Sequence, residues 1–308
     1  MLHQMLMTTV AENRRSRRWG IFFKFLTFGY LFLLLGLFFW SGDMDAVKSA
    51  GKEHTALVEV DGLIASDTKA SADKVITGLR NAFEDKKTKG VILRMNTPGG
   101  SPVQSRYINR EIVRLKKKYP KIPVYAVVVD MCASGGYYIA AAADKIYADE
   151  GSVVGSIGVL INGFGFVDGM QKLGIERRLM TAGEHKGMLD PFSPLQEQDK
   201  AHIQKLLAEL HQQFIDTVKE GRGDRLQDQT HPEIFSGLFW TGEEAKTLGL
   251  IDEFGSSSYV AREVIGAEEI VDFTPKEEVW DRFARRLGAG ATEMLARISG
   301  LGEGMEIR

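Results

Sequence analysis

Apolar and polar positions along the chain alternate between patterns typical of strands and patterns typical of helices. Short apolar runs rich in β-branched residues predict strands. These runs lie at 56–60, 90–95, 124–130, 145–149, 153–160 and 176–182. Apolar residues spaced three or four apart predict helices at 71–87, 102–119, 135–144 and 195–221. A capped helix, a turn and a strand are predicted over 240–256. This order favours an α/β fold in which helices pack on a mainly parallel sheet.

The longest apolar run lies near the N-terminus, at 19–40, and contains only one charged residue, Lys24. Its length suits a helix that crosses a bilayer core of about 30 Å. Four arginines just before it, at positions 14, 15, 17 and 18, orient the N-terminus toward the cytoplasm. A cleaved signal peptide has the same order of features, but its apolar core is shorter, and no clear Ala-x-Ala site follows Trp40. We therefore expect a single-pass anchor in the inner membrane, with the rest of the chain outside, in the periplasm of a Gram-negative cell.

These patterns divide the chain into five parts. They are a basic cytoplasmic N-terminus at 1–18, an anchor at 19–40, a linker at 41–55, one α/β domain at 56–270 and a C-terminal tail at 271–308. Apolar and basic residues alternate in the tail, which predicts a helix that packs on a neighbouring subunit, lies on the membrane or faces solvent.

Charge and cysteine content exclude some classes of function. Lys plus Arg number 39 and Asp plus Glu number 41, so nothing in the net charge of −2 indicates a nucleic-acid partner. Cys132 is the only cysteine, which excludes an intrachain disulfide. A small buried residue in a tight turn is a better interpretation of Cys132 than a thiol nucleophile.

The most informative turn follows the strand 124–130 and holds Ser134, Gly135 and Gly136 before a helix. Ligands and catalytic groups gather at the carboxyl ends of parallel strands. The N–H groups of a helix N-terminus would also stabilise an oxyanion beside the Ser134 hydroxyl. The alternative is that Ser134 only caps its helix. A second strand-to-helix turn, 94-RMNTPGGSP-102, bares backbone N–H groups, and both turns should open on the same edge of the sheet.

A serine nucleophile needs a base, and the loop 183–192 offers two neighbouring candidates. Of the six histidines, only His185 lies in a loop with other candidate groups, since His202 and His211 fit the polar face of a long helix. Lys186 follows it directly. A lysine can act as a base where desolvation lowers its pKa toward neutrality. The residues alone leave both candidates open.

Five motifs in order resemble the membrane-anchored bacterial signal peptide peptidase A (protease IV) family, in its short single-repeat form. They are 96-NTPGGS-101, 132-CASGGYYIA-140, 151-GSVVGSIGV-159, 183-GEHK-186 and 240-WTGEEAKTLGLID-252. The resemblance runs from about residue 55 to residue 260. It implies the α/β/α spiral around a mainly parallel sheet that this family shares with Clp protease and crotonases, and it makes 56–270 a peptidase domain.

The resemblance also implies roles for single residues and for the assembly. Ser134 matches the nucleophile of a Ser/Lys dyad, Lys186 the general base and Ser156 the hydroxyl that orients the lysine. Gly100 and Gly135 match the oxyanion donors. No metal or cofactor is implied. The family forms a bowl-like homo-oligomeric ring, octameric in the short form, with active sites at subunit contacts, and its substrates are remnant signal peptides or other small membrane-associated peptides.

The chain departs from the family pattern at one position, and two alternative functions have to be considered. The family often has arginine in a G-R-x-W-x-G stretch where this chain has Leu238, which puts local packing or assembly contacts in doubt. A crotonase-type acyl-CoA enzyme would use the same two turns, but acyl-CoA is cytoplasmic and the domain is expected outside. A non-catalytic scaffold ring is the other rival, and the presence of Ser134, Lys186 and Ser156 argues against it.

Overall fold

The computed structural model of the protein describes residues 17–34, 36 and 52–275, and the chain falls into two units, Met1–Lys52 and Glu53–Arg308. In the first unit, residues 17–34 are helical and their side chains are exposed. Within the described residues, no helix combines the length and apolarity that a membrane crossing needs. The predicted span 19–40 runs on into residues outside the described part, so the anchor stays a prediction.

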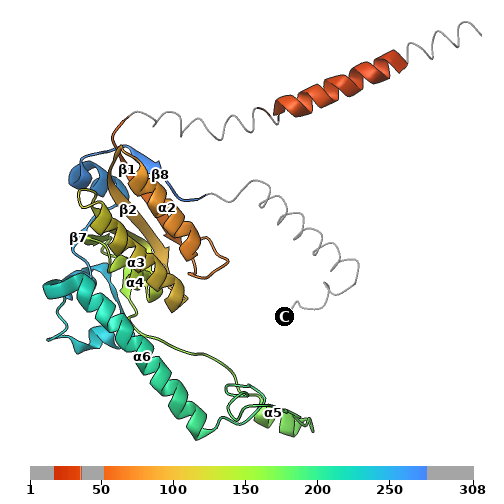
Figure 1. The fold of residues 1–308 in the computed structure, drawn as a ribbon, viewed down its shortest axis with the longest axis vertical. Helices are drawn as coiled ribbons and strands as arrows, with labels where there is room; N and C mark the ends of the chain where they lie inside the picture. Colours follow the sequence, from red (N-terminus) through yellow and green to blue (C-terminus); the bar gives the residue numbers. More distant parts are fainter. Residues whose placement is uncertain (1–16, 35, 37–51, 276–308) are drawn as a thin grey trace, which may run out of the picture. The chain divides into compact units, whose positions relative to one another are not determined.

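A mixed, mainly parallel sheet forms the centre of the second unit (Figure 1). Its strands are β1 (His54–Asp61), β2 (Thr88–Thr97), β3 (Val124–Ala133), β4 (Lys145–Ala148), β5 (Val153–Gly155), β6 (Phe239–Thr241), β7 (Glu253–Phe254) and β8 (Ile270–Asp272). The order is β6-β5-β3-β2-β1-β8, and β4 lies between β3 and β7 off this path. Only the β5–β6 pair is antiparallel among these strands.

Helices of very different lengths connect the strands. They are α2 (Ala72–Glu84), α3 (Pro102–Lys118), α4 (Gly135–Ala140), α5 (Val167–Lys172), α6 (Glu197–Arg222), α7 (Gly242–Thr247) and α8 (Ser257–Tyr259), with the short turns η1 (Gly223–Arg225), η2 (Pro232–Phe235) and η3 (Val260–Ile265). The apolar stripes of α2, α3 and α4 pack on one face of the sheet and form the larger core. The opposite face carries a smaller cluster in which Val260 and Ala261 cover Leu57, Ile92 and Val127. Because both faces are covered, the central strands are continuous apolar runs.

Strand β3 changes partners along its length, and this change positions the site. Its first half pairs with β4, from Tyr125 to Val127, and its last residues pair with β5, from Met131 to Ala133. The residue that follows β3 and the residue that follows β5 therefore emerge side by side. These residues are Ser134 and Ser156.

Two predicted strands differ from the structure. The strand predicted at 176–182 is wrong, because these described residues form no strand. A strand needs a hydrogen-bonded neighbour, and here the chain has left the sheet after β5 and returns to it only through α6 (Figure 1). The extended run predicted at 153–160 ends at Gly155, because Gly155 and Ser156 have φ angles of 113° and 52° that turn the chain away.

A buried ion pair joins the end of α6 to the sheet. The Arg222 side chain is 1% exposed, and its Nη1 donates to Asp252 Oδ2 at 2.7 Å. The same carboxylate accepts from the Ile146 backbone N–H in β4 at 2.7 Å. Burial raises the pKa of Asp252, but hydrogen bonds from Arg222 and its charge outweigh burial, and the pKa lies below its ordinary value.

We expect Arg222→Met to lower the free energy of unfolding by about 3 kcal/mol, because it removes the buried partner of the Asp252 carboxylate and leaves only the more exposed Arg225, whose Nη1 lies 3.2 Å from Asp252 Oδ1. Denaturant titration at neutral pH measures the change. Arg262→Met, which breaks an exposed pair with Glu263, is the matched control and should leave the midpoint almost unchanged. Because the pKa of Asp252 is lowered by folding, the pair stabilises above the unfolded pKa of aspartate and loses its effect as the pH falls through the folded pKa. The difference in the free energy of unfolding between wild type and Arg222→Met should therefore become smaller in acid. Equal denaturation midpoints at neutral pH would contradict this account.

Candidate active site

Ser134 occupies the sharp turn between β3 and α4 in an unusual backbone conformation. Its φ is 51° and its ψ is −121°, and its N–H donates to the Gly155 carbonyl at 2.8 Å. A capping serine has an extended backbone, and its side chain accepts from the N–H groups of its own helix. Ser134 differs in both respects, because its backbone is not extended and its side chain makes no capping hydrogen bond. Both features argue against a capping role for Ser134. The hydroxyl is therefore available for chemistry.

The two glycine turns predicted to share an edge do pack against each other. A Cβ on Gly99 would lie 2.7 Å from the Gly135 nitrogen, and a Cβ on Gly135 would lie 3.2 Å from the Gly100 nitrogen. Gly100 has a φ of 148°, and a Cβ there would lie 2.2 Å from the Ile64 carbonyl oxygen, so only glycine fits. Among the turn, loop and cap hydrogen bonds of the described residues, none uses the N–H of Gly100 or of Gly135. Two neighbouring N–H groups that make none of these hydrogen bonds, beside a hydroxyl, are suited to bind an oxyanion.

Ser156 lies next to Ser134 because β5 pairs in parallel with β3, with Gly155 opposite Ala133. The Ser156 N–H donates to the Leu238 carbonyl at 2.7 Å, which holds the turn against the start of β6. The Leu238 side chain itself is exposed, so the departure from the family pattern changes an outward-facing group and leaves this backbone contact in place. A bulkier residue than glycine at 155 would meet the Trp240 ring at 2.8 Å.

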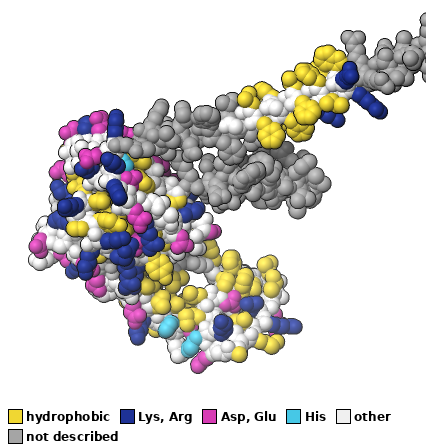
Figure 2. All heavy atoms as spheres, turned by 45° about the horizontal axis from the view of Figure 1, so that its top comes forward, with side chains coloured by type: hydrophobic (Ala, Val, Ile, Leu, Met, Phe, Trp, Pro, Cys, Tyr) yellow, Lys and Arg dark blue, Asp and Glu magenta, His cyan; other side chains and the backbone are white. Residues whose placement is uncertain are grey.

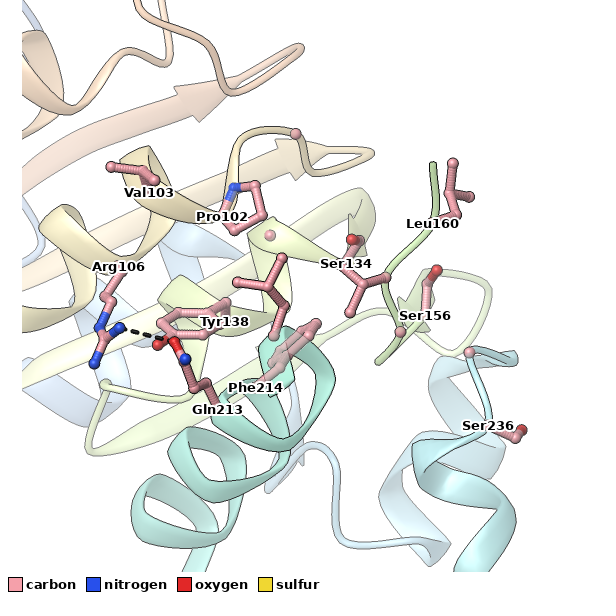
Figure 3. Close-up of a pocket in the computed structure, with 16 residues that line it drawn as sticks. Pro102, Val103, Arg106, Ser134, Tyr138, Ser156, Leu160, Gln213, Phe214 and Ser236 are labelled. Carbon is pink, nitrogen blue, oxygen red and sulfur yellow. Dashed lines mark hydrogen bonds between the residues drawn. The ribbon is translucent and has the colours of Figure 1, made fainter. Parts of the chain in front are cut away.

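A pocket of about 560 Å³ opens beside both serines, and its lining includes Gly100, Ser134, Gly135 and Ser156 (Figure 3). Residues that the sequence did not single out as part of a site form the rest of its wall. The larger of them are Val103, Arg106, Tyr138, Leu160, Leu210, Gln213 and Phe214. Leu210 and Phe214 belong to the apolar stripe of α6. Their spacing predicts that they share one face of a helix, but it does not predict that this face covers the pocket.

Two aromatic residues fix the floor of this pocket. The rings of Tyr138 and Phe214 have centroids 5.1 Å apart, and Thr217 Oγ1 donates to the Tyr138 hydroxyl oxygen at 2.9 Å. Tyr138 comes from α4, and the other two come from α6, so these contacts attach α6 to the helix that follows Ser134. They give the pocket a firm apolar surface close to the two serines.

Lys186 and His185 lie outside this pocket in the single chain. Both belong to residues 160–195, the segment between β5 and α6 that we call the arm, and neither lines the pocket. Lys186 is exposed. His185 Nδ1 lies 2.7 Å from Asp199 Oδ1 in the first turn of α6. The structure thus brings four of the predicted residues together and leaves both candidate bases apart from them.

The arm has no core of its own. None of its residues is buried, and α5 contributes no buried side chain. Figure 2 shows hydrophobic side chains gathered on its surface. The most exposed are Leu160, Phe164, Leu173, Ile175, Met180 and Leu195, each more than half exposed. An apolar surface of this kind, with little packing beneath it, is typical of a site for another molecule.

The structure assigns two other residues to packing. Cys132 is fully buried, and burial raises the pKa of its thiol, so the reactive thiolate is disfavoured. Its interpretation as a small core residue is confirmed. His211 Nε2 lies 3.1 Å from the Ile157 carbonyl oxygen, where it holds the start of the chain that leads to the arm.

Comparisons with known proteins indicate the family of this chain. The sequence profile of peptidase family S49 matches residues 116–270. A protein of Enterococcus faecium named "Putative signal peptide peptidase SppA" is 30% identical over 235 residues, which are 74% of this chain and 67% of that protein. A protein of Methanocaldococcus jannaschii named as a protease is 34% identical over 222 residues, 70% of each chain. The chain therefore belongs to peptidase family S49.

Other matches cover less or resemble the chain more weakly. A Brucella abortus protein named Na+/H+ antiporter NhaA is 48% identical over 188 residues, but the match spans 61% of this chain and only 25% of that protein. A solved structure of the 1510-N membrane-bound stomatin-specific protease with a substrate peptide aligns with 77% of this chain, at 18% identity and a TM-score of 0.45.

Proposed function

We propose that this protein is a serine endopeptidase in which Ser134 is the nucleophile and Lys186 the general base. One observation carries the proposal. The Ser134 hydroxyl caps no helix, its backbone has a left-handed φ of 51°, and the idle N–H groups of Gly100 and Gly135 lie beside it in a pocket. Membership of peptidase family S49 supports the same chemistry.

In the proposed reaction, each of these groups has one role. The neutral amine of Lys186 accepts the proton of the Ser134 hydroxyl, and the oxygen attacks the carbonyl carbon of a peptide bond. The N–H groups of Gly100 and Gly135 donate to the oxyanion that forms. The lysine returns the proton to the leaving amine, and water then hydrolyses the acyl-enzyme with the lysine again as base. Ser156 would hold the lysine amine in line with Ser134.

The base would come from a second copy of the chain. Lys186 does not line the pocket of its own chain, and it lies on an arm whose residues are all unburied. The apolar surface of the arm would become buried if it packed over the pocket of a neighbour. Val103 and Leu238 offer exposed apolar side chains at or near that pocket. Docking would then remove apolar surface from water and deliver the lysine in one step.

This contact favours a closed ring. Each copy would give its arm to one neighbour and receive an arm from another, so the two surfaces in contact differ. Contacts between unlike surfaces close into rings when the rotation between subunits permits. A homo-oligomeric ring, octameric as in the short form of the family, fits this rule, with its active sites at the contacts between subunits.

The apolar run 19–40 would anchor this ring in the inner membrane, with the N-terminus in the cytoplasm and the catalytic domain in the periplasm. That location would bring the active sites close to short peptides released in the bilayer. Remnant signal peptides and other small membrane-associated peptides are the proposed substrates. The name of the Enterococcus faecium relative supports this class of substrate.

Hydrolysis of a mixed peptide library by the full chain in detergent tests the proposed activity. Mass spectrometry of the products should show new termini inside the peptides, and the rate should be unaffected by a metal chelator. If the protein converts an acyl-CoA thioester and does not cleave the peptides, the result would favour the crotonase-type rival. An assembled chain that hydrolyses neither would favour a scaffold.

A methyl group on Gly135 should disturb the oxyanion donors. Its Cβ would lie 2.5 Å from Ser105 Oγ and 3.2 Å from the Gly100 nitrogen. We expect Gly135→Ala to lower kcat/KM for peptides by about 10²- to 10³-fold, the usual cost of losing one such donor. Because the closest contact is a hydroxyl, adding Ser105→Ala should restore part of the loss. Steady-state kinetics of the two single variants and the double variant measure this, and a fully active Gly135→Ala would argue against Gly135 as a donor.

A further inference from the structure

The pocket beside Ser134 contains one charged group. Of the 16 residues that line it, Arg106 is the only one whose side chain is charged at neutral pH, and all of them belong to the described part of the chain. Arg106 is half-buried in the second turn of α3. The residues around it are glycines, apolar residues or uncharged polar residues. The pocket therefore presents a single positive charge within a largely apolar wall.

Gln213 of α6, an exposed residue, accepts a hydrogen bond from this guanidinium. Arg106 Nη1 donates to Gln213 Oε1 at 2.9 Å, and Figure 3 shows the pair at one end of the pocket, with Ser134 and Ser156 toward the other. Because the partner is a neutral amide, the charge of the arginine is not compensated. No carboxylate forms an ion pair with Arg106 among residues 17–34, 36 and 52–275. A guanidinium has five N–H donors, and this hydrogen bond uses one of them.

We propose that Arg106 is a specificity residue that binds a carboxylate of the peptide substrate while Ser134 attacks a nearby bond. The inference rests on the proposed peptidase function. The carboxylate belongs either to an Asp or Glu side chain near the scissile bond or to the C-terminus of a short peptide. Arginine pairs with carboxylates through two parallel hydrogen bonds, and an arginine already held by Gln213 loses less freedom on binding. Tyr138 and Phe214 offer an apolar surface to the carbon atoms next to that carboxylate.

Two sets of matched peptides test this proposal with the full chain in detergent. In the first set, Glu is exchanged for Gln at each position within about three residues of the scissile bond. Three residues of an extended peptide span roughly 10 Å. In the second set, one peptide is made with a free C-terminal acid and with a C-terminal amide. We expect wild type to prefer the carboxylate member of at least one pair by about tenfold in kcat/KM.

Substitutions of Arg106 should change this preference. In Arg106→Gln the ratio of the two kcat/KM values should fall to about one, because the pairing charge is lost. In Arg106→Glu the enzyme should favour a peptide with Lys in place of Glu, since opposite charges attract and like charges repel. Arg110→Gln removes an exposed arginine of the same helix that does not line the pocket, and it should keep the wild-type ratio. Thermal unfolding of each variant verifies that the fold is intact.

The results separate this inference from the proposed function. A preference limited to the Glu/Gln pairs identifies a side chain as the source of the carboxylate, and one limited to the acid/amide pair identifies the C-terminus. Equal cleavage within every pair by wild type, or an unchanged ratio in Arg106→Gln, would overturn the role of Arg106 and leave the peptidase intact. If the assembled wild type cleaves no peptide of either set, the proposed function fails and the inference fails with it.

Discussion

Replacing Ser134 by alanine should abolish peptide hydrolysis, with a fall in kcat of at least about 10³-fold, as is usual when the nucleophile of a covalent mechanism is removed. The fold should survive, because the Ser134 side chain makes no capping hydrogen bond and the contact of this residue with Gly155 is made by the backbone N–H. Alanine at a φ of 51° costs about as much as serine, since both carry a Cβ. Initial rates on a fluorogenic peptide, measured with the full chain in detergent, give the result.

The control for this variant is Ser258→Ala, which removes an exposed hydroxyl on the short helix α8, outside the pocket. It should keep the activity of wild type. A Ser134→Ala chain that is folded, assembled and still active would show that another group attacks the substrate. The free hydroxyl at this turn would then need a different explanation.

A mixture of two inactive variants should regain activity. Lys186→Ala keeps Ser134 and loses the base, and Ser134→Ala keeps the base and loses the nucleophile. If the arm of one copy reaches the pocket of the next, a co-assembled ring contains sites with both groups intact. In an equal random mixture, a site is complete when two adjacent copies are of the right kinds in the right order, so activity should reach about a quarter of wild type.

The control for the mixture is the Ser134→Ala chain combined with the Ser134→Ala/Lys186→Ala double variant, which cannot form a complete site in any order. Mass spectrometry of the mixed assemblies verifies that subunits have exchanged. Mixed rings without activity would contradict a base supplied by a neighbour. A Lys186→Ala chain that is active alone, beside an inactive His185→Ala chain, would assign the base to the histidine.

Sequence reasoning was most reliable where structure depends on local patterns. The strands β1 to β4 and the helices α2, α3 and α6 follow from apolar spacing, and two glycine turns at the ends of β2 and β3 follow from the order of elements. Their meeting at one edge follows from parallel pairing, and the structure confirms it. The choice between a capping and a free Ser134 depends on a single φ angle, which the letters Ala-Ser-Gly-Gly do not determine.

The features that the sequence did not reveal depend on contacts between distant residues. Arg106 and Gln213 lie on different helices, α3 and α6, and only the packing of both helices against α4 places them in one pocket. The run 176–182 resembles a strand, but no neighbour pairs with it. The separation of Lys186 from Ser134 has the same origin, because the path of the arm is not set by local periodicity.

Active-site labelling tests the central claim most directly. The full chain in detergent is treated with a fluorophosphonate, which reacts with activated serine hydroxyls, and tandem mass spectrometry locates the adduct. We predict one major adduct on Ser134, lost in Ser134→Ala and strongly reduced in Lys186→Ala, because the hydroxyl is unreactive without its base. Labelling that spares Ser134 in the assembled, active protein, or that continues unchanged in Lys186→Ala, would contradict the account.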